Sequence, residues 1–425
     1  MGQYRSGIYK NLPPVNVFMK ILFLNDAIPP RNIGGPGFRN FEVARELLKR
    51  GNEVYFITSC QDREQEGEET KDGIKIFNIY SNYNLKYRNY VSVCNWAVLG
   101  KIKKIIKELK PDITHVDTVH IHLSYASIKV AKKHSKAVFL TSRDFMLYYP
   151  DKFIQKEKTC GEINYKVNWL DNLRVAKKRY NPFRNIMIKR YLKYVDKIFA
   201  ISEEMKKALN QNGIMNVDVL YNSLPIPADE PAYKTESNSK TIFFPSRTSE
   251  SKGVYALLAA FPFIKKNVVG AKILIVGTTE DRKKRILEYM GKNNISKENV
   301  EILGWVNNEE VKSIYGKVSV VVTPSLYPDP LLGVNLEAAL YKKPVVTTCF
   351  GGAKEFVVDG KTGYVVNPHD AKEMAEKITD ILLDGDKAKQ FGEAGYKRLK
   401  EKFSITVQVD KLENYYRNFC EKCAN

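Results

Sequence analysis

The chain has 425 residues, a formal net charge of +20, 44% hydrophobic residues and 27% charged residues. This length is too great for one compact core, so we expect two domains of about 200 residues each. The composition is that of a globular protein and excludes the disordered and fibrous classes. No apolar run reaches the roughly 18 residues that a membrane-spanning helix needs.

The positive charge is unevenly distributed. Residues 1–223 carry 38 Lys and Arg against 22 Asp and Glu, whereas residues 224–425 carry 30 against 26. A basic half indicates an acidic partner, which could be nucleic acid, an anionic membrane surface or a phosphate-bearing substrate.

The cysteines indicate a reducing compartment. Disulfides are rare in the cytosol, and the six cysteines are scattered along the chain at Cys60, Cys94, Cys160, Cys349, Cys420 and Cys423. The N-terminus also lacks the apolar core of a secretory signal, so we expect a cytoplasmic protein. The lone C-x-x-C pair at the C-terminus favours incidental thiols over a metal site.

The first predicted strand begins at Met19, in the apolar run MKILFLN, so residues 1–18 are interpreted as an N-terminal extension. A glycine-rich loop follows, with Gly34 and Gly35 just before an amphipathic helix. Glycines at this place let the backbone approach an anion at the helix N-terminus; a turn that simply needs glycine is the alternative. No G-x-G-x-x-G is present, so a nicotinamide cofactor is not expected.

Strands and helices then alternate up to residue 223. The basic helix near 101–110 has its apolar residues in one stripe, which favours a core-facing helix with solvated lysines over a membrane-surface helix. The strand DITHVD is followed by polar residues, and four of the five histidines lie within 114–134. Because strand ends in such sheets open onto the ligand crevice, we expect substrate contacts from Asp117, His120 and His122. A metal site is the alternative.

Two further features complete the first half of the chain. Arg143 and Asp144 follow the strand AVFLTS, and we expect them at the same edge of the sheet. Residues 151–197 form a long insertion with aromatic residues and 13 Lys and Arg against 5 acidic residues. Insertions of this kind commonly carry specificity.

The second half restarts the strand–helix pattern after a linker rich in Pro and Ser. We assign domains to 19–223 and 241–403, the linker to 224–240, and a C-terminal helix to 404–425, packing back toward the first domain. Arg247 and Lys252 lie between a buried strand and a helix that Ser251 is expected to cap. Two fixed cations there can meet the negative charge of a diphosphate.

The most informative stretch is 319–368. Its apolar runs 318–323 and 344–348 are typical of strands buried on both faces of a parallel sheet. Between them lies a polar loop and then a helix that opens near Gly333. Asp329 and Glu337 flank that helix N-terminus, where free N–H groups can hold a diphosphate and the carboxylates can accept bonds from sugar hydroxyls.

These residues resemble the donor-sugar site of the retaining glycosyltransferases of family 4, the glycosyl transferases group 1. Asp329-x7-Glu337, followed by Gly351-Gly352 and Glu355, is similar to the family's Glu-x7-Glu and Gly-Gly-x-x-Glu, with a shorter first acid. Arg247 and Lys252 match its Gly-Arg-x4-Lys-Gly. Residues 141–144 resemble its Thr-x-His-Asp, with Arg143 in the histidine's place. The resemblance spans about 19–418.

The resemblance implies the GT-B fold, that is, an α/β protein with two doubly wound Rossmann-like domains and the active site in the cleft between them. It implies that Glu337 accepts bonds from the donor ribose and Asp329 from the transferred sugar. The implied catalytic residues are Arg247, Lys252, Asp329 and Glu337, and the implied donor-binding residues are Gly34, Gly35, Val306, Leu331, Leu332, Gly333 and Val334. The residues expected on the acceptor side are Asp117, His120, His122, Arg143 and Asp144.

The function that follows is transfer of a hexosyl group, with retention, from a UDP- or GDP-hexose to a hydroxyl of a carbohydrate or lipid-linked acceptor. No metal and no other cofactor are expected. The alternative enzyme is a related GT-B protein, such as a nucleotide-sugar epimerase or a sugar phosphorylase. A basic nucleic-acid-binding protein is a third class, disfavoured because no recognisable binding module is present. The basic first domain also predicts peripheral contact with an anionic membrane.

Overall fold

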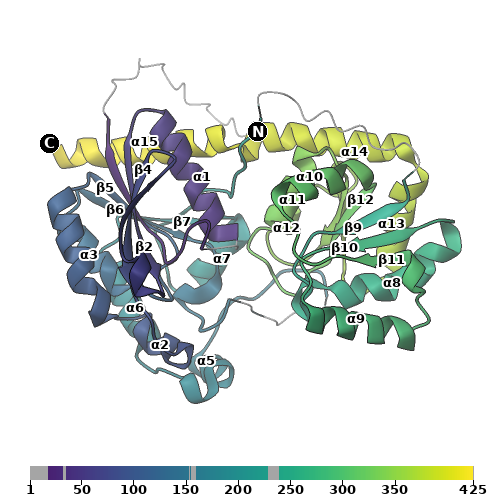
Figure 1. Cartoon of the computed structure of the whole chain (residues 1–425), viewed down its shortest axis with the longest axis horizontal. Helices are drawn as coiled ribbons and strands as arrows, with labels where there is room; N and C mark the ends of the chain where they lie inside the picture. Colours follow the sequence, from purple (N-terminus) through teal and green to yellow (C-terminus); the bar gives the residue numbers. More distant parts are fainter. Residues whose placement is uncertain (1–17, 32–34, 153, 155–158, 228–238, 425) are drawn as a thin grey trace, which may run out of the picture.

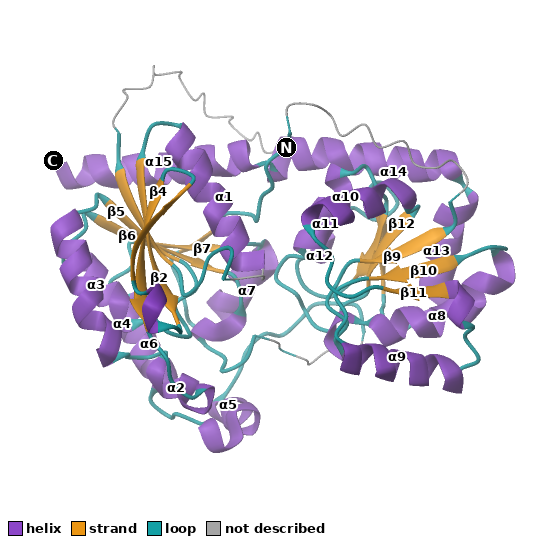
Figure 2. Ribbon diagram, in the orientation of Figure 1, coloured by secondary structure: helices purple, strands orange, loops and turns teal. Residues whose placement is uncertain are grey.

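A computed structural model describes residues 18–31, 35–152, 154, 159–227 and 239–424. They form two α/β domains that lie next to one another, each with a central sheet between layers of helices (Figures 1 and 2). Most of the expected extension 1–18 and most of the linker 224–240 lie outside the described residues.

The N-terminal domain is built on an eight-stranded sheet with the order β3-β4-β2-β1-β5-β6-β7-β8. All neighbouring strands are parallel except β3 and β4. The inner strands are runs of Ile, Val, Leu and Phe that are buried on both faces, as a helix-covered parallel sheet requires. The strands are β1 Lys20–Leu24, β2 Glu53–Cys60, β3 Gly67–Lys71, β4 Ile74–Tyr80, β5 Ile113–Val116, β6 Ala137–Ser142, β7 Lys197–Ala200 and β8 Val217–Val219.

Helices cover both faces of this sheet, and each face has its own hydrophobic cluster. In α3, Val98, Ile102 and Ile106 are buried and the lysines between them face outward, so the prediction of a core-facing stripe is confirmed. The helices are α1 Gly35–Lys49, α2 Arg88–Val91, α3 Trp96–Leu109, α4 Ala126–Lys132, α5 Trp169–Ala176, α6 Arg184–Leu192 and α7 Glu203–Gln211.

The C-terminal domain has a parallel six-stranded sheet with the order β11-β10-β9-β12-β13-β14. The order reverses direction between β9 and β12, which is where α/β sheets bind their ligands. The strands are β9 Thr241–Phe244, β10 Lys272–Ile275, β11 Val300–Ile302, β12 Val320–Thr323, β13 Val345–Thr348 and β14 Gly363–Val366. The helices are α8 Val254–Asn267, α9 Glu280–Lys292, α10 Asn308–Lys317, α11 Gly333–Leu340, α12 Ala353–Phe356 and α13 Ala371–Leu383. Two doubly wound domains confirm the predicted GT-B fold class.

The end of the chain returns to the N-terminal domain. Helix α14 (Gly385–Arg398) is followed by a π-helical turn and by α15 (Ile405–Ala424), and the two helices run one after the other along one edge of both domains (Figure 1). Val409, Leu412 and Tyr416 of α15 join the cluster beneath the N-terminal sheet. Arg50, directly after α1, pairs with Asp410 and Glu413 of α15.

No helix in the described parts of the chain combines the length and the apolar character needed to cross a lipid bilayer.

Candidate functional site

The candidate site is centred on the N-terminus of α11. Helix α11 begins at Gly333, directly after the loop that follows β12, and its N-cap residue Leu332 offers no side-chain hydrogen bond. Buried Asn335 fixes the helix on the sheet, because it bonds to Thr323 of β12 and to Thr347 of β13. At the reversal point of the sheet, the first turn of α11 thus has no side-chain cap from Leu332, although the Asn335 N–H already donates to Leu332 O.

Asp329 lies in this loop and is held by a cation. Lys252 Nζ is 2.6 Å from Asp329 Oδ2, and the Tyr327 hydroxyl donates to the same oxygen at 2.5 Å. The ammonium also lies 4.9 Å from the centre of the Tyr327 ring. Burial, and secondarily the Asp329 charge, raises the pKa of Tyr327, so this hydroxyl stays protonated and continues to donate.

Glu337 is also held by a cation, which comes from the other domain. Nη2 of Arg39, on α1, lies 2.5 Å from Glu337 Oε1. Both carboxylates that the motif predicts are thus members of ion pairs, one in the loop before α11 and one on α11 itself. Sequence reasoning did not identify Arg39, since its partner lies 298 positions away.

The Gly351-Gly352 pair permits a close approach of backbone to backbone. A Cβ on Gly352 would lie 1.9 Å from Pro330 O, and one on Gly351, where φ is +69°, would lie 2.3 Å from Asp329 O. The Gly352 N–H donates to Asp329 O at 2.9 Å. These glycines therefore fix the loop that carries Asp329.

Glu355 makes a contact between the domains. Its two carboxylate oxygens accept hydrogen bonds from the backbone N–H groups of Glu203 and Glu204, in the first turn of α7. Burial raises the pKa of Glu355, and the two N–H bonds oppose that shift. A carboxylate from one domain thus caps a helix of the other.

The other predicted donor-side residues lie around this centre. Arg247 is exposed and has no ion pair among the residues that the structure describes. Leu331 and Leu332 are buried, Gly333 and Val334 open α11, and Val306 is half-buried. Gly35 begins α1, whereas Gly34 lies outside the described residues.

The prediction that Ser251 caps the following helix is wrong, because Gly253, with φ +80°, is the N-cap of α8. A Cβ at Gly253 would lie 1.9 Å from Pro324 O, so the chain enters α8 in contact with the loop after β12.

The predicted acceptor-side residues gather at the carboxyl ends of β5 and β6. Arg143 Nε lies 2.7 Å from Asp117 Oδ2, and its Nη1 donates to Asn222. His120 Nε2 is buried and lies 3.6 Å from Asp144 Oδ2, beyond hydrogen-bonding distance. His122 Nδ1 is 3.1 Å from the Ser81 hydroxyl. Asp117, Arg143, Asp144 and His120 thus interact as one polar group at these strand ends, whereas His122 contacts Ser81.

Burial disfavours the charged form of three histidines. Burial lowers the pKa of His115 and of His120 to about 3, and that of His122 to about 4. His115 bonds to the Tyr416 hydroxyl and to the Thr141 hydroxyl, so it joins β5 to α15 and β6. Within the described residues, no three His, Cys, Asp or Glu side chains come together as metal ligands.

Asp26 is a second residue that sequence reasoning missed. It follows β1, and its carboxylate accepts hydrogen bonds from the backbone N–H groups of Ile121, His122 and Leu123. Burial raises its pKa to about 6, although the three N–H bonds act in the opposite direction. Asp26 thus fixes the loop that carries His120 and His122. An apolar strand followed by Asn-Asp was the only signal for it in the sequence.

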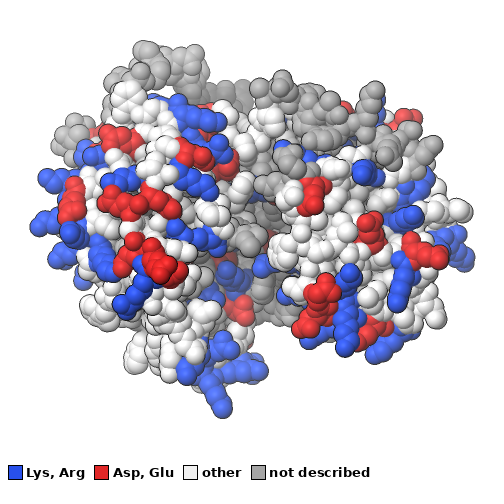
Figure 3. All heavy atoms as spheres, viewed as in Figure 1, with Lys and Arg blue, Asp and Glu red and all other residues white. Residues whose placement is uncertain are grey.

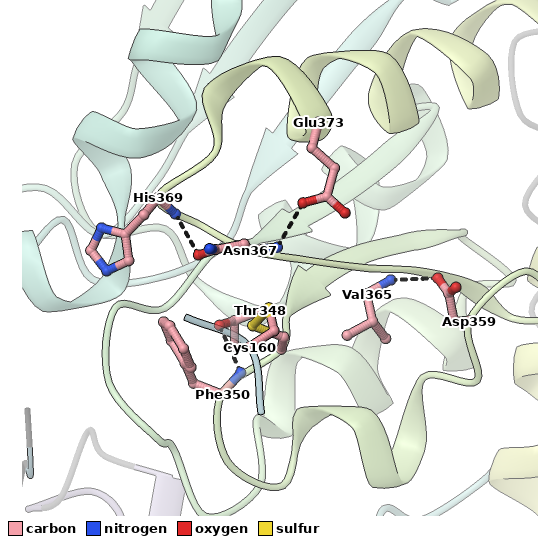
Figure 4. The surroundings of a disulfide bond; sticks show 9 residues. Cys160, Thr348, Phe350, Asp359, Val365, Asn367, His369 and Glu373 are labelled. Carbon is pink, nitrogen blue, oxygen red and sulfur yellow. Dashed lines mark hydrogen bonds between the residues drawn. A yellow bond between two sulfur atoms is a disulfide. The ribbon is translucent and has the colours of Figure 1, made fainter. Parts of the chain in front are cut away.

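The cysteines depart from the expectation for a reducing cytosol. Cys160 and Cys349 form a disulfide across 189 sequence positions. Cys349 lies between Thr348 and Phe350, at the end of β13 and two residues before Gly351, and Cys160 belongs to the insertion of the first domain (Figure 4). Spacing gave no sign of this pair, because its members come from different domains. Cys60 and Cys94 are free thiols, and the side chain of Cys423 lies outside the described residues.

Comparison with known proteins identifies both halves of the chain. Residues 33–226 match the family model described as Glycosyltransferase Family 4, and residues 226–398 match the one described as Glycosyl transferases group 1. The capsular polysaccharide biosynthesis glycosyltransferase CapM of Staphylococcus aureus is 29% identical over 46% of this chain and 50% of its own length, so the match spans half of that relative.

Solved structures share the fold over almost the whole chain. Sucrose-phosphate synthase from Thermosynechococcus elongatus has a TM-score of 0.72 at 17% identity, covering 94% of this chain and 98% of its own. Anabaena HepE in complex with UDP-glucose has a TM-score of 0.66 at 18% identity, covering 94% and 100%. With two family models that together span residues 33–398 and this shared architecture, the chain belongs to the family 4, group 1 glycosyltransferases of GT-B fold.

Proposed function

We propose that the protein transfers a hexosyl group from a UDP- or GDP-hexose to a hydroxyl acceptor, with retention of anomeric configuration. The observation that supports this most is the arrangement at the N-terminus of α11. The helix starts without a side-chain cap, and both the loop before it and the helix itself carry a carboxylate–cation pair. Such an end binds a diphosphate, and the carboxylates suit the hydroxyls of ribose and sugar. HepE, which shares this fold, binds UDP-glucose.

In the proposed reaction, the acceptor oxygen forms a bond to the anomeric carbon as the bond from that carbon to the diphosphate breaks. The acceptor proton passes to the leaving diphosphate on the same face of the sugar. Arg247 and Lys252 balance the negative charge that develops on the leaving group. No protein carboxylate acts as a nucleophile, and Asp329 and Glu337 hold the donor.

Transfer is proposed to need no metal ion, because cations and a helix N-terminus take the place of a bound divalent cation. Activity should therefore survive EDTA. Loss of activity in EDTA, restored by Mn²⁺, would contradict this part of the proposal.

We place the acceptor beside Asp117, His120, His122, Arg143 and Asp144. The proposed acceptor is a carbohydrate or a lipid-linked sugar that serves the synthesis of a cell-surface polysaccharide, a glycolipid or another glycan. CapM, the relative from S. aureus, is named for capsular polysaccharide biosynthesis.

The proposed site of action is the cytoplasmic face of an anionic membrane. Apolar side chains are exposed on α5, on α6 and at the N-cap of α6: Trp169, Ile186 and Phe183 are 62%, 57% and 68% exposed. The basic run 177–179 lies between these helices, and Lys and Arg gather at the tip of the first domain where α5 lies (Figure 3). An apolar surface with a basic rim suits a bilayer interface, at roughly 1 kcal/mol for each basic residue near the surface.

The proposed membrane contact can be tested with a matched control. Replacing Lys177, Lys178 and Arg179 by Gln should reduce sedimentation with anionic vesicles, whereas replacing Lys103, Lys104 and Lys107 of α3, also exposed, should not. Equal loss in both variants would mean that only net charge matters.

The donor arm is tested by thermal unfolding with a panel of nucleotides and nucleotide sugars. A ligand present at 100 times its Kd stabilises the folded state by about 2.7 kcal/mol. We expect one nucleoside diphosphate and its hexose conjugate to raise Tm. If no nucleoside diphosphate or nucleotide sugar raises Tm, the proposed donor class is wrong.

A further inference from the structure

The guanidinium of Arg39 makes its ion pair with the other domain. Arg39 lies on α1, in the N-terminal domain, yet its side chain reaches the C-terminal domain and pairs with Glu337 there. Only 7% of the side chain is exposed. A buried charge is costly unless it is paired and its donors are satisfied, so each of its N–H groups needs a partner.

One of those groups has none. Nη1 of Arg39 is buried, and it has no hydrogen-bond partner in the part of the chain that the structure describes. Buried donors without a partner are rare in folded proteins. Arginine presents its donors in a rigid fork, so the bond from Nη2 to Glu337 fixes the direction in which Nη1 points.

The second observation is what Arg39 lies against. A Cβ on Gly333, the first residue of α11, would lie 3.3 Å from Arg39 Nη2 and 3.8 Å from its Nε. A helix N-terminus carries partial positive charge, and α11 has no side-chain cap. A cation and a positive helix end therefore meet beside a single carboxylate, that of Glu337. An anion at this point would contact the helix N–H groups and the guanidinium of Arg39 together.

We propose that Arg39 is a donor-binding residue supplied by the acceptor domain, and that its guanidinium binds the diphosphate of the nucleotide sugar at the N-terminus of α11. This inference rests on the proposed function of the site. Glu337 orients the guanidinium through Nη2, and Arg247 and Lys252 bind the diphosphate from the other side. The donor is then held by both domains at once.

The test separates phosphate binding from a structural role. Affinities of the full-length wild type and of Arg39→Gln are measured for UDP and GDP by calorimetry, and for uridine and guanosine by NMR titration. We expect Arg39→Gln to weaken binding of the preferred nucleoside diphosphate about ten- to a hundredfold, the effect of one charge-assisted hydrogen bond. Affinity for the matching nucleoside should change less than threefold. Arg39→Lys keeps the charge without the fork, so it should weaken diphosphate binding less than Arg39→Gln does.

Arg45→Gln is the matched control, because Arg45 lies on the same helix and its ion pairs, with Glu42 and Asp72, lie outside the site. It should bind both ligands as the wild type does. Unchanged diphosphate affinity in Arg39→Gln would overturn the inference, and so would an equal loss for diphosphate and nucleoside, which means that Arg39 acts only by placing Glu337. If Arg39→Gln does not fold, Arg39→Lys decides between the same outcomes. A wild type that binds neither UDP nor GDP contradicts the proposed function itself.

Discussion

At the scale of single residues, the cations of the site differ in whether a described carboxylate of the protein pairs with them. Lys252 and Arg39 are each paired with a carboxylate, whereas Arg247 is exposed and has no ion pair among the described residues. In the proposed reaction its charge is used only when the diphosphate is present, so its loss should affect turnover and not folding.

Arg247→Ala should reduce kcat/KM about ten- to a hundredfold, since one charge-assisted hydrogen bond to the leaving group contributes about 1.5–3 kcal/mol. Steady-state kinetics with the preferred donor measure the loss, and Tm should stay at the wild-type value. Lys266→Ala, an exposed change on α8 of the same domain, is the control. Near-wild-type turnover by Arg247→Ala would remove this residue from the diphosphate site.

Gly352 is constrained by packing alone, since its φ of −83° is open to any residue. A Cβ there would lie 1.9 Å from Pro330 O and 3.1 Å from the Ser202 side chain of the other domain. Gly352→Ala should therefore displace the loop that carries Asp329 and reduce kcat/KM at least tenfold. Gly385→Ala, where nothing lies within 4 Å of the new Cβ, should have no effect. Full activity in Gly352→Ala would show that this loop tolerates displacement.

At the scale of elements, the loop after β5 depends on buried groups that titrate. The pKa values of His115, His120 and His122 are lowered by burial to about 3, 3 and 4, whereas an unfolded histidine has a pKa of about 6.5. The unfolded chain therefore binds more protons below pH 6.5. Their contribution to stability is complete above pH 6.5 and is lost as the pH falls toward 4.

Each buried histidine should add a slope of about 1.2 kcal/mol per pH unit to the free energy of unfolding between pH 6 and 5. His122→Asn should reduce the slope by that amount, and His134→Asn, at a partly buried position, is the control. The pKa of Asp26 is raised to about 6, so its protonation stabilises the folded state as the pH falls. This opposite contribution is the same in the wild type and in both variants. Urea unfolding at both pH values measures the slope, and an unchanged slope in His122→Asn would show that this histidine titrates normally.

At the scale of the whole molecule, the two domains are joined by more than the linker. Arg39 pairs with Glu337, Glu355 caps α7, and α15 returns to the first domain. The Cys160–Cys349 disulfide joins the insertion of the first domain to the loop after β13. Each of these contacts involves a segment next to the candidate site or to the junction of the two domains. We therefore expect donor binding to depend on how the two domains are arranged.

Reduction of the disulfide should lower Tm in the wild type, because a disulfide that closes a long loop contributes typically about 2–4 kcal/mol. Cys160→Ser should show no response to reductant, and Cys94→Ser, which removes a free thiol, should respond as the wild type does. Peptide mapping without reductant should yield the peptide that contains both cysteines. Alkylation of Cys160 and Cys349 in the unreduced protein would contradict the pairing.

The features that the sequence predicted rest on local signals, whereas the features that it missed rest on contacts between residues far apart in the sequence. The opening of α11 at Gly333 and the places of Asp329 and Glu337 followed from short apolar strands and one helix start, which are local signals. The partners of those acids did not: Lys252 lies 77 positions from Asp329, and Arg39 lies 298 positions from Glu337. Ion pairs between distant segments depend on tertiary packing, which no local periodicity records. The Ser251 cap failed for a related reason, because packing against Pro324 O sets the chain direction at Gly253.

The most direct test of the central claim needs no knowledge of the acceptor. Slow hydrolysis of the preferred nucleotide hexose by the wild type, followed by time-resolved ¹H NMR, reports the anomer that is released before mutarotation. A retaining transferase that attacks on the face of the leaving diphosphate should release first the anomer present in the donor. Initial release of the opposite anomer would contradict the proposed mechanism, and conversion of the donor to an isomer without release of sugar would identify an epimerase instead.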